Sequence, residues 1–180
     1  MNNNSIFFIF ISCMGQNKCD ELSKFIYTNT ESKNVYNETY LMGKDAIPCL
    51  IDLIDINKKT LVGFQDPKSS TIYPFTFNNQ IGIKAAYLIE FILSKDSIEA
   101  IKGVEWEQKI KPYRIYQYGV IVKKENNTPV LEPLNYDDMK ELKEIYSKWW
   151  QLNKEKPLEL LRKEWKGNNL ILNNSCYKWI

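Results

Sequence analysis

Apolar residues recur at intervals of three or four along residues 43–54 and predict a helix that buries one face. The positions on this face are Ala46, Leu50, Leu53 and Ile54. Asp45 stands where its side chain can cap the first turn, and Pro48 falls within that turn, where its missing N–H is tolerated. We therefore expect the helix to begin at Asp45 and to pack against the core.

A second apolar stretch, residues 81–93, predicts another buried helix, and its two adjacent alanines would let a neighbouring helix approach closely. The pattern Gly-x-x-Ala-Ile-Pro-x-Leu in residues 43–50 resembles the second helix of a HEAT repeat. Two such helices do not make an array, because repeat proteins need at least three units. β-Branched and aromatic residues alternate with other residues along 60–64 and 71–77, which predicts a hairpin or an ordered loop. The resemblance therefore implies a HEAT-like helical layer and no array.

The carboxyl-terminal half begins with a strand pattern and then turns helical. Residues 113–123 alternate between two faces, residues 126–129 read as a turn, and residues 130–131 can return antiparallel. A capping-box pattern then starts a long helix that runs to about Asn153. It is formed by Asn135 and Asp138.

Shorter elements complete the prediction. Pro157 opens a last helix that Gly167 closes, and the apolar tail 170–180 packs back on the core. Short helices are also expected over 19–28 and 36–42. The fold class is mostly α (α+β), with a HEAT-like helical layer and one or two β-hairpins in a single domain spanning residues 19–180.

The amino terminus suggests a targeting signal. Residues 6–11 are the most apolar run of the chain, yet they are too short to span a bilayer, which needs about 20 residues. A serine and Cys13 follow, which resembles the signal peptide of a bacterial lipoprotein. The resemblance implies that residues 1–12 are removed, that Cys13 is lipidated and anchors the chain in a membrane, and that residues 13–18 form a tether. Residues 1–5 carry no Lys or Arg, unlike most signal peptides. The alternative is a buried strand of a cytoplasmic protein.

Composition removes several classes of function. Lys and Arg number 24 and Asp and Glu 22, so the formal net charge is only +2. A dedicated nucleic-acid binder needs a concentrated basic surface, and we therefore expect no nucleic-acid partner. The chain has no His, which excludes imidazole metal ligands and every mechanism with a His base. We accordingly predict no cofactor and no metal.

The four cysteines show no C-x-x-C spacing of a redox or zinc motif. Three remain after Cys13, and an odd number cannot all pair within one chain. Cys49 falls in an apolar helix, where it would behave as a small hydrophobe. One disulfide, between Cys19 and Cys176, is the pairing to consider in an oxidising compartment. The sequence leaves open whether any of the three is paired.

Carboxylate pairs are the main candidates for acid–base chemistry, because two carboxyl groups with split pKa values can hydrolyse glycosides. The pairs are Asp52 with Asp55, Asp137 with Asp138, and Glu105 with Glu107. Acids in the first turn of a helix stabilise its dipole, and acids on a polar helix face are solvated. These positions favour structural roles, and no catalytic residue is predicted.

Aromatic residues offer a candidate binding surface. Trp149 and Trp150 fall within the apolar arc of their helix, which favours core packing. The strand residues Tyr113, Tyr116 and Tyr118 are better placed for exposure, and Tyr presents a large rigid area that suits a protein interface.

Three functional hypotheses follow. The first is a non-catalytic lipoprotein, anchored in the bacterial cell envelope, that binds a protein partner. Together the signal-like start, the HEAT-like helices and the Trp/Tyr-rich end resemble small bacterial lipoproteins, which implies an immunity-type role toward a toxin. The second is an envelope glycan or peptidoglycan binder, or a hydrolase, that uses a carboxylate and the Tyr/Trp surface. The third is a cytoplasmic helical scaffold.

Overall fold

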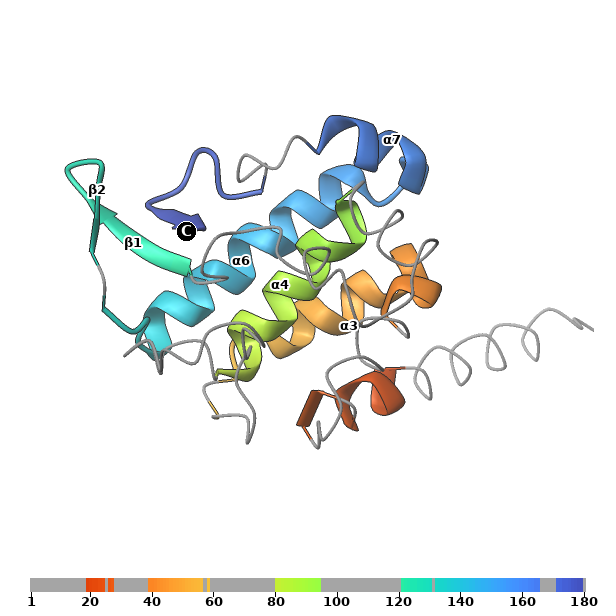
Figure 1. Cartoon of the computed structure of the whole chain (residues 1–180), viewed down its shortest axis with the longest axis horizontal. Coiled ribbons are helices and arrows are strands. Elements are labelled where there is room, and N and C mark those ends of the chain that lie inside the picture. Colours follow the sequence, from red (N-terminus) through yellow and green to blue (C-terminus); the bar gives the residue numbers. More distant parts are fainter. Residues whose placement is uncertain are drawn as a thin grey trace, which may run out of the picture.

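The structure is a computed structural model and describes residues 19–24, 26–27, 39–56, 58, 80–94, 121–130, 132–165 and 171–179. The expected hairpin or loop at 60–64 and 71–77 lies outside these residues, as does the strand pattern from 113 to 120. In the described part, helices dominate and a small sheet lies at one end (Figure 1).

Two short helical segments precede the core helices. Residues 19–24 and 26–27 are helical, as predicted, and residues 39–42 lead into the 3-10 helix η1 (Gly43–Asp45). The α-helix α3 (Ala46–Leu53) follows without a break. The prediction that Asp45 caps this helix is wrong: Asp45 already has helical dihedral angles, and its side chain makes no capping hydrogen bond. Because η1 runs directly into α3, the Ala46 amide already donates to the carbonyl oxygens of Gly43 and Lys44, and this amide needs no side-chain cap.

Helix α4 (Ile81–Leu93) has the predicted bounds, and all its residues are buried. It packs beside α3 in the middle of the molecule (Figure 1). The two backbones approach closely at Gly82, where an added Cβ would overlap the carbonyl oxygen of Ile54 and crowd the end of the Met139 side chain. A glycine at this point therefore lets α4 lie against the end of α3.

The long helix α6 (Tyr136–Asn153) begins with the predicted capping box. The Asp138 amide donates to Asn135 Oδ1 at 3.0 Å, and the Asn135 amide donates to Asp138 Oδ2 at 3.1 Å. Its apolar arc packs on the core, with Trp149 and Trp150 partly buried against it, as predicted. Helix α7 (Leu158–Glu164) follows Pro157, also as predicted, and the expected stop at Gly167 lies outside the described residues.

The sheet has three antiparallel strands in the order β2-β1-β3: β1 (Ile121–Glu125), β2 (Thr128–Val130) and β3 (Tyr177–Trp179). Asn126 and Asn127 join the first two strands with φ angles of 51° and 64°, so they form the two-residue turn that suits the twist of a hairpin. Residues 177–179 pair with residues 121–123. The tail therefore packs on the core, as expected, and does so as a strand.

The fold class is confirmed: the molecule is a mostly helical α+β domain with a small antiparallel sheet. The further resemblance to HEAT repeats stays a prediction. So do the signal peptide over residues 1–12 and the tether over residues 13–18, which lie outside the described residues.

Candidate functional site

Several of the residues singled out for function lie outside the described residues. They are Cys13, Tyr113, Tyr116 and Tyr118, together with the pair Glu105 and Glu107. Their roles stay predictions, and the candidate site has to be built from the remaining side chains.

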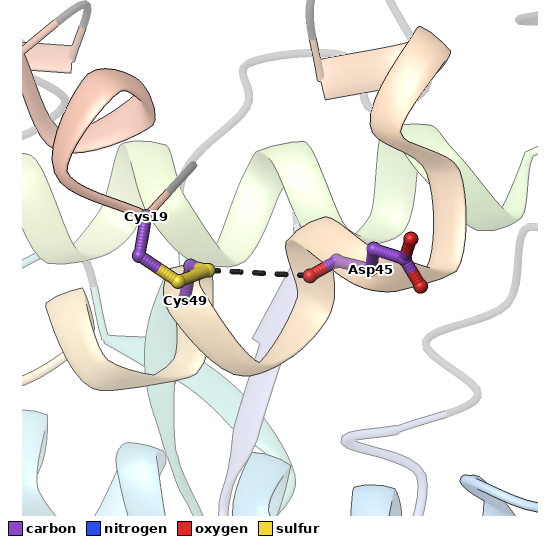
Figure 2. The surroundings of a disulfide bond; sticks show 3 residues. All are labelled: Cys19, Asp45 and Cys49. Carbon is purple, nitrogen blue, oxygen red and sulfur yellow. Dashed lines mark hydrogen bonds between the residues drawn. A yellow bond between two sulfur atoms is a disulfide. The ribbon is translucent and has the colours of Figure 1, made fainter. Parts of the chain in front are cut away.

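A disulfide bond joins Cys19 to Cys49, with the two Cα atoms 5.2 Å apart. It ties the first helical segment to α3 (Figure 2). Leu22 and Ile26 of that segment are buried in the core, which brings Cys19 beside α3. Cys49 Sγ lies 4.0 Å from the Asp45 carbonyl oxygen (Figure 2), and because a disulfide sulfur carries no proton, this is a packing contact.

The considered pairing of Cys19 with Cys176 is therefore wrong, and so is the expectation that Cys49 acts as an unpaired small hydrophobe. Cys176 is free and half-buried just before β3, with its Sγ 3.9 Å from Glu141 Oε1. Two cysteines that are 30 residues apart give no sequence signal of pairing. Only the packing of the first helical segment brings them together.

A polar cluster joins the start of α6 to the sheet. Lys123 Nζ lies 2.8 Å from Asp138 Oδ1. The Tyr177 hydroxyl lies 3.1 Å from the same oxygen and 2.8 Å from Glu141 Oε2. The residues come from β1, α6 and β3, so their contacts connect the sheet to the start of the helix.

The electrostatics of this cluster favour a structural role. Burial alone would raise the pKa of Asp138, but the hydrogen bonds that its carboxylate accepts outweigh burial and lower the pKa. The hydrogen bond to Asp138 and its charge raise the pKa of Lys123. Burial, together with the neighbouring Glu141 and Asp138, raises the pKa of Tyr177. Asp138 therefore stays ionised, while Lys123 and Tyr177 keep their protons, and none of the three is tuned as a base near neutral pH.

The acidic pairs that are described have the expected structural roles. Asp138 is buried in its capping box, whereas Asp137 points to solvent. Asp52 is exposed, and Asp55 accepts from Lys143 at 3.0 Å. The Asp138 carboxylate is committed to the helix cap and to Lys123, and the Asp55 carboxylate to Lys143, so neither pair offers the two free carboxyl groups that glycoside hydrolysis requires.

A buried hydrogen-bond network centres on Glu90 of α4. Tyr146 donates from its hydroxyl to Glu90 Oε1 at 3.0 Å, and Trp165 Nε1 donates to Glu90 Oε2 at 2.6 Å. Trp179 Nε1 donates to the Tyr146 hydroxyl at 3.2 Å. The network connects α4, α6, the end of α7 and β3, so it orients four elements around one carboxylate.

Lys84 is a charged residue that lies buried in the core. Its side chain is 4% exposed, and burial lowers its pKa to about 8. Its Nζ and Thr39 Oγ1 are the buried side-chain polar atoms that find no hydrogen-bond partner in the described part of the chain. We assign Lys84 no chemistry.

An open depression of about 440 Å³ lies beside the end of α3, on the outer face of α6. It is lined by Asp55, Lys140, Lys143, Glu144, Ser147 and Lys148. Sequence reasoning missed this set because Asp55 is distant in sequence, and lysines spaced along a polar helix face normally indicate only solvation.

Within the described ranges, no three His, Cys, Asp or Glu side chains gather to hold a metal ion. In the same ranges, none of the helices combines the length and the apolar character that crossing a membrane requires. Comparisons with protein families, with curated proteins and with solved structures find no match to this chain.

Proposed function

We propose that this chain is a non-catalytic lipoprotein of the bacterial cell envelope that binds a protein partner. The observation that carries the proposal is the disulfide between Cys19 and Cys49. Disulfides form and persist in oxidising compartments and are rare where glutathione and thioredoxin keep thiols reduced. The bond therefore supports export of the chain, which the lipoprotein-like start also predicts.

The position of the disulfide fits a short anchor. Residues 13–18 would be all that separates a lipid on Cys13 from the disulfide, and six residues reach at most about 20 Å. Because Cys19 is bonded to α3, the tether would end on the core of the domain. The domain would then stand close to the membrane, where a partner in the envelope can reach it.

The alternatives have less support. A hydrolase needs a tuned carboxylate pair, and the described acids of the predicted pairs are engaged in a helix cap and an ion pair or lie in solvent. A cytoplasmic scaffold would not be expected to hold a disulfide in its core. An immunity-type role toward a toxin remains one form of the proposed binding function.

Counting thiols tests the anchor directly. We expect the chain from its native host, denatured without reductant and treated with iodoacetamide, to gain one label, on Cys176. After reduction it should gain three labels, because a lipidated Cys13 cannot react. Intact mass should also show the acyl groups on Cys13. Two labels before reduction and four after it would refute the anchor.

The matched control is Cys13→Ala grown with a labelled fatty acid. This variant should incorporate no fatty acid, should appear in the soluble fraction and should still give one label before reduction. If the wild-type chain also incorporates no fatty acid and is soluble with Met1 intact, the envelope proposal fails.

A further inference from the structure

The depression on α6 offers more hydrogen-bond donors than acceptors. Three of its six lining residues are lysines, and Ser147 adds a half-buried hydroxyl for which the described residues supply no partner. Its two carboxylates come from Asp55 and Glu144. Its volume of about 440 Å³ falls within the range of ligand sites, although it is open to solvent.

Lys143 fixes one side of this depression. Its ammonium group donates to Asp55 Oδ1 at 3.0 Å and to the Asp52 carbonyl oxygen at 3.2 Å. The second contact is with the last turn of α3, where unpaired carbonyl groups carry partial negative charge. Lys143 therefore offsets much of the negative charge of Asp55 and of the α3 carbonyl end, which would otherwise repel an anion.

The two remaining lysines are available to a ligand. Lys140 Nζ stands 4.3 Å from the centre of the Tyr136 ring and makes no ion pair within the described residues. Lys148 Nζ lies 4.0 Å from Glu144, and both side chains are more than two-thirds exposed, so this pair is weak. After internal pairing, the depression keeps a net positive charge and a hydroxyl donor.

We propose that this depression binds carboxylate side chains of an acidic segment on the partner protein. The inference rests on the proposed function and adds the chemistry of the partner to it. Lys140 and Lys148 supply the attraction, and Ser147 donates to a carboxylate seated between them. Because the site is open and its charges are solvated, binding is weak and decreases with salt.

Fluorescence anisotropy with a labelled hexaglutamate peptide and the full chain tests this inference. We expect the wild-type chain to bind hexaglutamate at low salt and not to bind hexalysine. The double variant Lys140→Gln/Lys148→Gln should weaken binding about fivefold, at roughly 0.5 kcal/mol for each exposed pair. Glu144→Gln removes a competing acceptor and should strengthen binding about twofold.

The matched control is Lys163→Gln, which removes an exposed lysine of α7 outside the depression. It should leave peptide affinity unchanged. Equal weakening by the control and the double variant, or no weakening by the double variant, would overturn the inference. Tighter binding of free glutarate than of the peptide would do so as well, since it would indicate a small-molecule site.

A last experiment measures binding of the chain to vesicles of phosphatidylglycerol. Binding to these vesicles that depends on the two lysines, with no binding to the peptide, would assign the lysines to the membrane surface and overturn the inference. The thiol count reports separately on the anchor, so failure of the proposed function and failure of the depression are distinguishable.

Discussion

Burial of the Lys84 side chain makes an unfavourable contribution to the free energy of folding. Its ammonium group has no polar partner within the described residues, and removing a charge from water without compensation is unfavourable. Burial therefore favours the neutral amine over the ammonium group, which is why the pKa of Lys84 falls from 10.5 to about 8. At neutral pH the amine is still mostly charged, so the folded state bears the penalty.

The penalty makes stability depend on pH. Between pH 8 and 10 the unfolded chain holds the Lys84 proton while the folded chain has lost it, so the free energy of unfolding should rise with pH by about 2 kcal/mol. Lys84→Met should remove this rise and should stabilise the fold at pH 7 by about 3 kcal/mol. Urea unfolding of both proteins at pH 7, 8, 9 and 10 measures the effect. A wild-type curve parallel to that of the variant would contradict it.

At the scale of elements, the contact between α3 and α4 depends on a missing side chain. Alanine is the better helix former by about 1 kcal/mol, so helix propensity alone would favour Gly82→Ala. The added Cβ would, however, overlap the Ile54 carbonyl oxygen, which belongs to the backbone and cannot rotate away. We expect this steric overlap to outweigh the gain in helix propensity, so that the substitution lowers the stability of the fold.

We therefore expect Gly82→Ala to destabilise the fold by about 2 kcal/mol, in the range of overpacked cores. Gly43→Ala is the matched comparison, because Gly43 has a φ of 56° and the new Cβ would meet only the flexible end of Leu158. It should cost about 1 kcal/mol from backbone strain. Thermal unfolding ranks the two variants, and a Gly82→Ala protein as stable as the wild type would show that α4 can shift.

Elements with strong local signals could be predicted from the sequence. Helix α4 has the predicted bounds because its thirteen residues form a mostly apolar run that is long enough for a buried helix. The Asn135–Asp138 capping box marks the start of α6. Strand β3 was missed because three residues are too short for a pattern. The candidate site could not be predicted, since the disulfide joins residues 30 positions apart and the depression needs Asp55 beside α6, from which it is distant in the sequence.

At the scale of the whole molecule, the disulfide closes a large covalent ring. The bond links residues 30 positions apart and so limits the conformations of the unfolded chain. For a loop of this length the chain-entropy relation gives about 3 to 4 kcal/mol of stabilisation. That contribution is comparable to a large part of the net stability of a small domain.

Cys19→Ala/Cys49→Ala should therefore lower the free energy of unfolding by about 3 to 4 kcal/mol. Adding a reductant should have the same effect on the wild-type chain and none on the double variant. Cys176→Ala, which removes the free thiol, should change stability by less than about 1 kcal/mol. Equal urea midpoints for wild type and double variant would show that the ring does not form in solution.

The same ring determines what a protease can release. A cut anywhere between residues 20 and 48 leaves both pieces joined through sulfur, so the domain stays attached to whatever holds its amino terminus. A cut on the amino-terminal side of Cys19 sets the domain free at once. If Cys13 is the anchor, a pull from a bound partner passes from the tether through the sulfur–sulfur bond into α3 and bypasses the enclosed residues. Shedding of the domain then requires cleavage within residues 13–18, or a cut inside the ring followed by reduction.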